Sequence, residues 1–127
     1  MGAAAIRDQA EAFGFNSGFE IPLRAATSLF PQDPDAPQTA LSAIGQFEVR
    51  ATALQMAMVA ASIGNSGRTM NPYLVQEIRG PDLSILQTTE PSQFEDALKP
   101  SNSLSLTEML VNVVENGTGS NAQIAGV

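Results

Sequence analysis

The chain has 127 residues, a formal net charge of −7, and neither cysteine nor histidine. This length suits one domain with a hydrophobic core, and a hydrophobic content of 43% argues against a disordered chain. The six basic residues are spread along the sequence, which disfavours nucleic acid and anionic membrane surfaces as partners. Without cysteine or histidine, disulfides, thiolate or imidazole metal sites, and His-based triads are excluded.

The sequence carries no recognisable targeting or membrane segment. Residues 1–5 lack a charged region followed by an apolar stretch of signal length. No run of about eighteen apolar residues occurs, so no transmembrane helix is expected. If a longer parent protein is exported or anchored, we expect its signal outside these residues.

Residues 3–13 are rich in good helix formers and place Ile6, Ala10 and Phe13 on one apolar face. This pattern predicts an amphipathic helix that Gly14 ends. Residues 15–41 contain four prolines together with turn-forming aspartates, which predicts a long loop. Several apolar side chains in this loop indicate that it packs onto another part of the protein.

Residues 51–64 give the strongest helical pattern, with Leu54, Met58 and Ala61 along one face. Nearly every other side of this helix is also apolar, which predicts a helix buried all round. The segment is too short to span a bilayer, and we interpret its methionines as fillers of a core. Residues 65–67 are turn formers that end the helix.

Residues 73–79 and 84–89 read as two short strands joined by a Gly-Pro-Asp turn at 80–82. Two strands alone are marginally stable in water, so this hairpin is expected to pack on the helices or to extend a sheet.

A further helix is predicted from Leu106 to Glu115. Ser105 and Glu108 have the spacing of a capping box, in which each side chain accepts from a free backbone N–H. The Asn-Gly pair at 116–117 closes the helix.

Five short segments in this order resemble one protein family. Residues 13–23 resemble "L-G-F-G…I-x-L-P", residues 40–46 resemble "A-T-x-S-I-G-Q-G", and residues 52–57 resemble "T-P-L-Q-L-A". Residues 60–72 resemble "A-A-I-A-N-G-G…x-P", and residues 114–119 resemble "V-V-x-x-G-T-G". Together the order and spacing are specific for the transpeptidase domain of class B penicillin-binding proteins, within the penicillin-binding and serine β-lactamase superfamily.

The chain departs from the family pattern at two of these places. Phe47 follows Gln46 where the family usually has glycine, and Ala53 stands where proline usually opens the helix. Ala53 keeps helix propensity, whereas Phe47 makes its turn bulkier. The resemblance implies an α+β fold: residues 1–127 as a partial transpeptidase domain, mostly helical with a short β-hairpin.

The resemblance also implies a chemistry whose residues this chain lacks. In the family, a serine in S-x-x-K attacks the D-Ala-D-Ala end of a peptidoglycan stem peptide, S-x-N assists proton transfer, and K-T-G binds the substrate carboxylate. The only lysine is Lys99, and Asp96 stands three residues before it. No S-x-N or K-T-G occurs either, so we expect the first two motifs before Met1 and the third just beyond Val127. We therefore predict no catalytic, cofactor-binding or metal-binding residue here.

Three features are candidate exceptions to this absence of functional residues. Glu20 lies in the loop that resembles the region where class A β-lactamases keep a deacylating glutamate, but a solvated loop acid is the favoured interpretation. Ser42 is assigned a structural role, because the segment is expected to shape packing under the active-site lobe. Residues 117–119 (GTG) lack the lysine of a phosphate-binding loop and are interpreted as a helix-ending turn that leads into the K-T-G strand.

The leading hypothesis is a fragment of a cell-wall D,D-transpeptidase, inactive alone, whose parent binds stem peptides and β-lactams and is anchored in the cell membrane with this domain outside. A stand-alone helical binding module remains as the alternative, and an enzyme using carboxylates, such as a glycosidase, is the weakest one. Since the apolar faces would lack their partners, the isolated chain is expected to self-associate or to need the rest of its domain.

Overall fold

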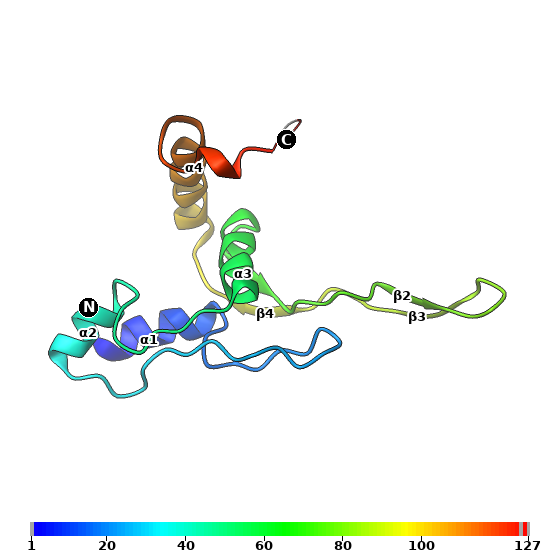
Figure 1. Ribbon diagram of the computed structural model, residues 1–127, viewed down its shortest axis with the longest axis horizontal. Helices are drawn as coiled ribbons and strands as arrows, with labels where there is room; N and C mark the ends of the chain where they lie inside the picture. Colours follow the sequence, from blue (N-terminus) through cyan, green and yellow to red (C-terminus); the bar gives the residue numbers. More distant parts are fainter. Residues whose placement is uncertain (1, 125, 127) are drawn as a thin grey trace.

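The computed structural model describes residues 2–124 and 126, and it has an open, branched outline (Figure 1). A body of helices lies at one end, and a narrow two-stranded ribbon extends away from it. The predicted α+β class, mostly helical with a short hairpin, is confirmed. The elements in chain order are α1 (Ala3–Ala12), α2 (Ala36–Ser42), α3 (Ala53–Gly64), β1 (Arg68–Met70), β2 (Glu77–Arg79), β3 (Ile85–Thr88), β4 (Gln93–Asp96), α4 (Pro100–Asn116) and the 3₁₀ helix η1 (Ser120–Ala122).

Helix α1 confirms the first predicted helix to within one residue. Phe13 caps it, and Gly14 follows with φ +103°, a backbone conformation that favours glycine. The amide of Gln9 donates to the carbonyl of Ala97 at 2.7 Å, which ties α1 to the segment between β4 and α4.

Helix α2 begins inside the stretch predicted to be a loop, so that prediction is wrong for residues 36–41. Asp35 accepts from the backbone N–H of Gln38 at 2.8 Å, and the Gln38 side chain accepts from the N–H of Asp35 at 2.9 Å. Pro37 lies in the first turn, where a missing N–H costs no hydrogen bond. Pro37, which was interpreted as a helix breaker, therefore lies at the start of a helix.

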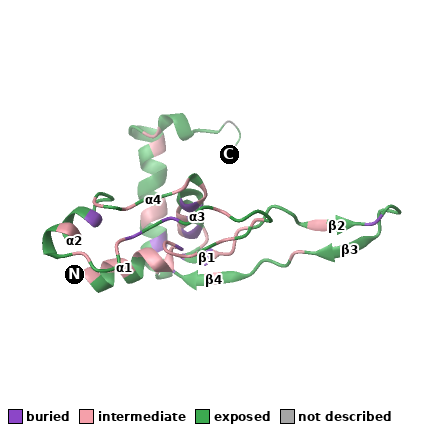
Figure 2. Ribbon diagram, turned by 60° about the horizontal axis from the view of Figure 1, so that its bottom comes forward, coloured by how far each residue is buried: buried purple, intermediate pink, exposed green. Residues whose placement is uncertain are grey.

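Helix α3 forms as predicted, with Thr52 as its N-cap, but it is not buried on all sides. Its buried residues are Gln55, Met58 and Ser62, whereas Met56 is 54% exposed. The prediction of a helix buried all round is therefore wrong: Ala53, Met56, Ala57, Ala60 and Ala61 are exposed, and Figure 2 colours α3 partly as buried and partly as exposed.

The predicted hairpin is confirmed as β2 and β3, which are shorter than expected and pair antiparallel with Ile78 opposite Gln87. The same ribbon continues toward the body as β1 and β4, which also pair antiparallel and were not predicted. Between the two pairs, Asn71 donates to the carbonyl of Ser92 at 2.9 Å. The chain thus runs out along one long ribbon and returns beside itself (Figure 1).

Helix α4 begins six residues before the predicted start, with Lys99 as N-cap and Pro100 in the first turn. Ser105 lies inside this helix, so the predicted capping box at Ser105 is wrong. The predicted end is confirmed, because Gly117 caps α4. Helix α4 packs against α3, and the hydroxyl of Ser103 donates to the carbonyl of Ile63.

The core where α1, α3 and β1 meet is small and held by hydroxyl groups. Thr69 on β1 is fully buried, and its hydroxyl donates to the carbonyl of Ala12 at 3.1 Å. Ser62 Oγ lies 3.0 Å from Thr69 Oγ1 and 2.7 Å from the carbonyl oxygen of Met58. Buried hydrogen bonds of this kind fix geometry, because leaving either partner unpaired is costly.

Candidate functional site

The structure places Ser42 inside α2, where it is 3% exposed. Its hydroxyl donates to the carbonyl of Gln38 at 2.8 Å, one turn earlier in the same helix. A serine needs an adjacent base to become a nucleophile near neutral pH, and a backbone carbonyl cannot take its proton. The geometry supports the structural role predicted for Ser42.

Glu20 lies on the exposed loop between α1 and α2. Its backbone forms an isolated antiparallel bridge with Arg24 across a tight turn. Nothing in this placement brings its carboxylate to a serine hydroxyl, which fits the interpretation as a solvated loop acid.

The glycines of the GTG segment close α4. The backbone N–H groups of Gly117 and Gly119 both donate to the carbonyl of Val113, at 3.1 and 3.0 Å. An anion-binding loop offers its N–H groups to the ligand, and these two are already used. The geometry thus supports a helix-ending turn.

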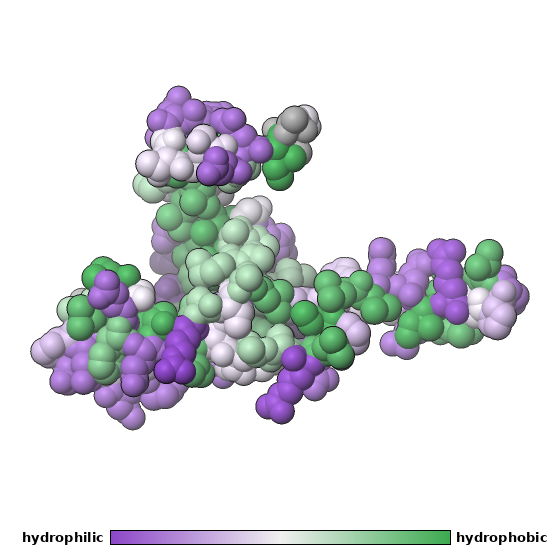
Figure 3. Space-filling view, viewed as in Figure 1, coloured by the Kyte–Doolittle hydropathy of each residue, from purple (hydrophilic) through white to green (hydrophobic). Residues whose placement is uncertain are grey.

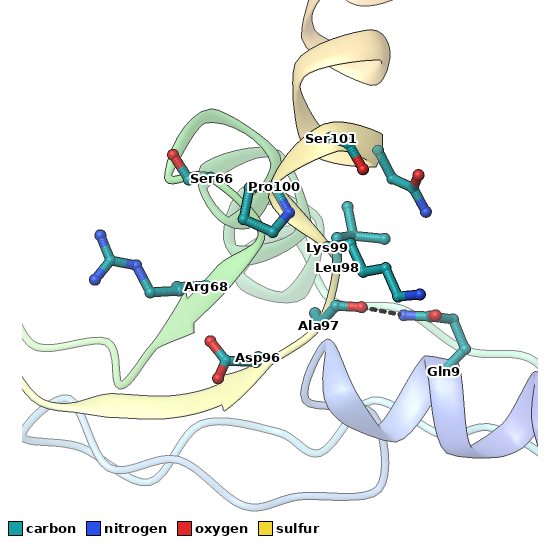
Figure 4. A pocket seen from close by; sticks show the side chains of 10 residues that line it. Gln9, Ser66, Arg68, Asp96, Ala97, Leu98, Lys99, Pro100 and Ser101 are labelled. Atoms are coloured by element: carbon teal, nitrogen blue, oxygen red, sulfur yellow. Dashed lines mark hydrogen bonds between the residues drawn. The ribbon is translucent and has the colours of Figure 1, made fainter.

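Lys99 lies beside a hollow of about 950 Å³ between α1, the β1–β4 pair and the start of α4. Figure 4 shows its side chain extending toward Gln9, away from the hydroxyls of Ser66 and Ser101, which line the same hollow. Among the described residues, no hydrogen bond joins the Lys99 ammonium to a serine hydroxyl; its carbonyl accepts from the backbone N–H of Ser103 at 3.0 Å. The hollow also holds Arg68 and Asp96, and it is lined by Gln9, Ser66, Arg68, Asp96, Ala97, Leu98, Lys99, Pro100, Ser101 and Asn102.

One serine hydroxyl does meet a carboxylate: Ser84 donates to Asp82 Oδ1 at 2.6 Å. The backbone N–H of Ser84 donates to the same oxygen at 3.2 Å, so the pair is a turn motif at the tip of the ribbon. The Ser84 hydroxyl lowers the pKa of the Asp82 carboxyl. A lowered pKa weakens the carboxylate as a base, and both residues are exposed. This pair therefore lacks the properties of a nucleophile and its base.

Asn16 is a key polar residue that sequence reasoning missed. It has φ +61°, which asparagine tolerates. Its side chain accepts from the N–H of Phe30 at 2.9 Å and donates to the carbonyl of Phe30 at 3.1 Å. Asn16 also donates to Glu11 at 3.1 Å, and Gln32 does the same; these two bonds lower the pKa of the Glu11 carboxyl. Asn16 thereby clamps the long loop onto the end of α1.

Gln55 is a second polar residue whose role only the structure reveals. It is 3% exposed, and its amide donates to the carbonyl of Phe13 at 2.6 Å.

Within residues 2–124 and 126, no three carboxylates lie close enough together to hold a metal ion. The polar side chains buried in this chain satisfy backbone groups, which is a scaffolding arrangement.

The family model for the penicillin binding protein transpeptidase domain matches residues 1–127. The chain belongs to the penicillin-binding transpeptidase family, as the five sequence segments predicted. It is 40% identical, over 99% of its length, to the peptidoglycan D,D-transpeptidase PbpA of Mycolicibacterium smegmatis, of which it covers 26%. The chain thus spans about a quarter of the length of this curated relative.

Two solved structures show the same fold. Penicillin-binding protein A from M. tuberculosis, in an imipenem acyl-enzyme complex, matches 99% of this chain at 39% identity with a TM-score of 0.88, and 29% of that chain is covered. The penicillin G acyl-enzyme complex of the same protein matches 91% of this chain at 40% identity with a TM-score of 0.84, and 28% of it is covered. The predicted partial transpeptidase fold is confirmed.

Proposed function

We propose that residues 1–127 are a non-catalytic part of a transpeptidase domain, and that the complete domain cross-links peptidoglycan stem peptides through an acyl-serine intermediate. The family match over the whole chain and the likeness to the acyl-enzyme complexes support this proposal. The non-catalytic part of the proposal depends on one observation. Within the described residues, the serine hydroxyls that form hydrogen bonds meet backbone groups, other hydroxyls, an amide or the Asp82 carboxylate, and none meets a lysine.

In the complete domain, the S-x-x-K serine attacks the D-Ala-D-Ala end of one stem peptide and the terminal D-Ala leaves, which forms the acyl-serine. An amine of a second stem peptide then takes the acyl group and frees the serine. Backbone N–H donors stabilise the oxyanion that forms during each step. The contribution of the present residues is positional. The Ser62–Thr69 pair and the Asn16 clamp hold α1, α3 and the ribbon in one arrangement, and α4 ends in the GTG turn toward the expected K-T-G strand.

A fluorescent penicillin tests this proposal, because β-lactams acylate the same serine as the stem peptide. We expect no covalent label on the 127-residue chain. We expect a label on a chimera in which this chain replaces the matching segment of M. tuberculosis penicillin-binding protein A, which is known in a penicillin G acyl-enzyme complex. Label on the isolated chain would contradict the non-catalytic role. A chimera that folds but takes no label would favour a stand-alone binding module.

We also propose that the parent is a cell-membrane protein with this domain on the outer side, where its peptidoglycan substrate lies. The support is the family membership, since the curated relative is a peptidoglycan transpeptidase. Among the described residues, no helix is long and apolar enough to cross a membrane.

The isolated chain is further proposed to self-associate. Large apolar side chains such as Leu23, Leu74 and Leu104 are more than half exposed, and exposed apolar patches favour association. Size-exclusion chromatography at increasing protein concentration is expected to show a shift toward larger species. A concentration-independent monomer would contradict this expectation.

A further inference from the structure

Helix α4 ends in a turn whose main chain folds back onto the last residues of the helix. The carbonyl oxygen of Val113 accepts from the backbone N–H groups of both Gly117 and Gly119, at 3.1 and 3.0 Å. Hydrophilic and small side chains cover the visible face of this end of the helix (Figure 3). The place of the turn is therefore fixed by main-chain hydrogen bonds and close contact rather than by the burial of large apolar side chains.

Both positions of the turn require glycine because of space and not because of backbone angles. Gly117 has φ −116° and Gly119 has φ −85°, so both lie outside the left-handed region that favours glycine. A Cβ atom at position 117 would lie 2.9 Å from the carbonyl oxygen of Val113. At position 119 it would lie 3.0 Å from Val113 Cγ1. Both distances are shorter than the roughly 3.5–4.0 Å of an ordinary carbon contact, so a side chain at either position pushes the turn away from the helix.

The turn also sets the path of the chain that follows it. The backbone N–H of Ala122 donates to the carbonyl of Gly119 at 2.9 Å, so η1 begins directly at the turn. The side chain of Gln123 donates to the carbonyl of Val114 at 3.2 Å, which ties the end of η1 to α4. Residues 122–124 and α4 line one hollow of about 800 Å³. The place at which the chain leaves α4 therefore depends on how closely the turn approaches the helix.

We propose that Gly117 and Gly119 are positioning residues for the acylation step of the complete domain. They hold the turn against Val113 and thereby fix the start of the segment that leads to the K-T-G strand. This inference rests on the proposed function, in which that strand follows residue 127 and binds the substrate carboxylate. A misplacement of about 1 Å can slow an enzyme by about a hundredfold. A displaced turn is therefore expected to slow acylation, in addition to any effect on stability.

The second-order rate constant of acylation by a fluorescent penicillin tests this role in the chimera with M. tuberculosis penicillin-binding protein A. The rate constant is measured on protein shown to be folded by circular dichroism, because a loss of stability alone does not change it. In Gly117→Ala it is expected to fall by about tenfold or more. In Gly119→Ala it is expected to fall by about threefold or more, since the contact there is looser and partly with a side chain.

A second substitution separates the close contact from other damage. Val113→Ala removes Cγ1 and keeps the carbonyl that accepts both hydrogen bonds, so by itself it is expected to change the rate constant by less than about twofold. Added to Gly119→Ala, it is expected to restore most of the lost rate, because the nearest overlap is with Cγ1. Added to Gly117→Ala, it is expected to restore nothing, because the overlap there is with main-chain atoms.

Unchanged acylation in the folded Gly117→Ala and Gly119→Ala chimeras would overturn the inference. Rescue of both variants by Val113→Ala, or of neither, would also overturn it, because the two contacts involve different atoms. If Gly117→Ala does not fold, the rate constants of Gly119→Ala with and without Val113→Ala decide the question. A parent chimera that takes no label contradicts the proposed function, whereas a labelled parent with unaffected glycine variants overturns only the positioning role.

Discussion

Replacing Gly67 with alanine is expected to lower the free energy of unfolding of this chain by about 3 kcal/mol or more, since a left-handed backbone and a steric clash add together. Gly67 has φ +88° and is buried where β1 begins. A Cβ atom there would press against the carbonyl oxygen of Leu98 and lie 2.8 Å from its carbonyl carbon. These are main-chain atoms, so a change of rotamer cannot relieve the overlap.

The backbone at Gly67 also holds the start of the α4 connection. Its carbonyl accepts from the N–H groups of Ala97 and Leu98, at 2.9 and 3.0 Å. Moving this carbonyl to make room for a methyl group would break the junction of β1, β4 and α4. We therefore expect the variant to lose the packing of α4 on α3 as well as stability.

Gly64→Ala is the matched control, three residues earlier. A Cβ atom at Gly64 meets nothing within 4 Å, and Gly64 is the last residue of α3. Alanine in a helical position stabilises by about 0.5–1 kcal/mol relative to glycine. Urea unfolding followed by circular dichroism measures both variants. A loss of unfolding free energy below about 1 kcal/mol in Gly67→Ala would show that the main chain at Leu98 can move away at little cost, and would contradict the prediction.

Replacing Asn16 with aspartate is expected to lower the free energy of unfolding by about 2 kcal/mol or more at neutral pH, because two part-buried hydrogen bonds are lost and like charges meet. The substitution keeps the size of the side chain and the oxygen that accepts from Phe30 N–H. It removes the amide that donates to the carbonyl of Phe30 and to Glu11, both at 3.1 Å. A carboxylate oxygen would then face another carboxylate and a carbonyl.

The pH dependence separates this cause from general damage. In the natural chain, bonds from Asn16 and then Gln32 lower the pKa of Glu11. A lowered folded-state pKa gives stability that is present above the unfolded-state pKa and is lost as pH falls through the folded-state pKa. In Asn16→Asp, the facing carboxylates raise each other's pKa, so the variant is expected to recover stability relative to the natural chain as the pH falls.

Asn16→Gly serves as the control for Asn16→Asp. Glycine keeps the positive φ without strain and removes both side-chain hydrogen bonds to Phe30 without adding a charge. We expect a loss of about 1–3 kcal/mol whose recovery at low pH is smaller than that of Asn16→Asp, because only the lost bond to Glu11, and no charge repulsion, depends on pH. Denaturant unfolding at a series of pH values measures this difference. Parallel profiles for the aspartate and glycine variants would contradict the charge argument.

The sequence alone identified the features that depend on local order. The helix at 3–12, the helix at 53–64 and the Gly-Pro-Asp turn of the ribbon were all predicted, because periodicity and turn residues act over a few neighbours. The family followed from the order of five segments. The lack of S-x-x-K, S-x-N and K-T-G was equally readable, since it concerns which residues are present.

Some local features were misread although the sequence carried them. Asp35 and Gln38 have the spacing of a capping box, yet the neighbouring prolines led to a predicted loop. Pro100 marks the true start of α4 in the same way, because proline suits the first turn of a helix. In both cases a proline lies in the first turn of a helix; the prolines of residues 15–41 were read as breakers, and Pro100 was not used to place the start of α4.

Only the tertiary structure decided which polar residues are buried and which apolar residues are exposed. Thr69 finds its acceptor at Ala12, 57 positions away, and Gln55 finds Phe13, 42 positions away. Strands β1 and β4 likewise exist because each offers the other its hydrogen bonds. Helix α3 contains no charged residue, so its sequence has no alternation of charged and apolar sides that would predict which side is buried. The hydrogen-bond partners of Gln55 and Ser62 determine which side faces inward.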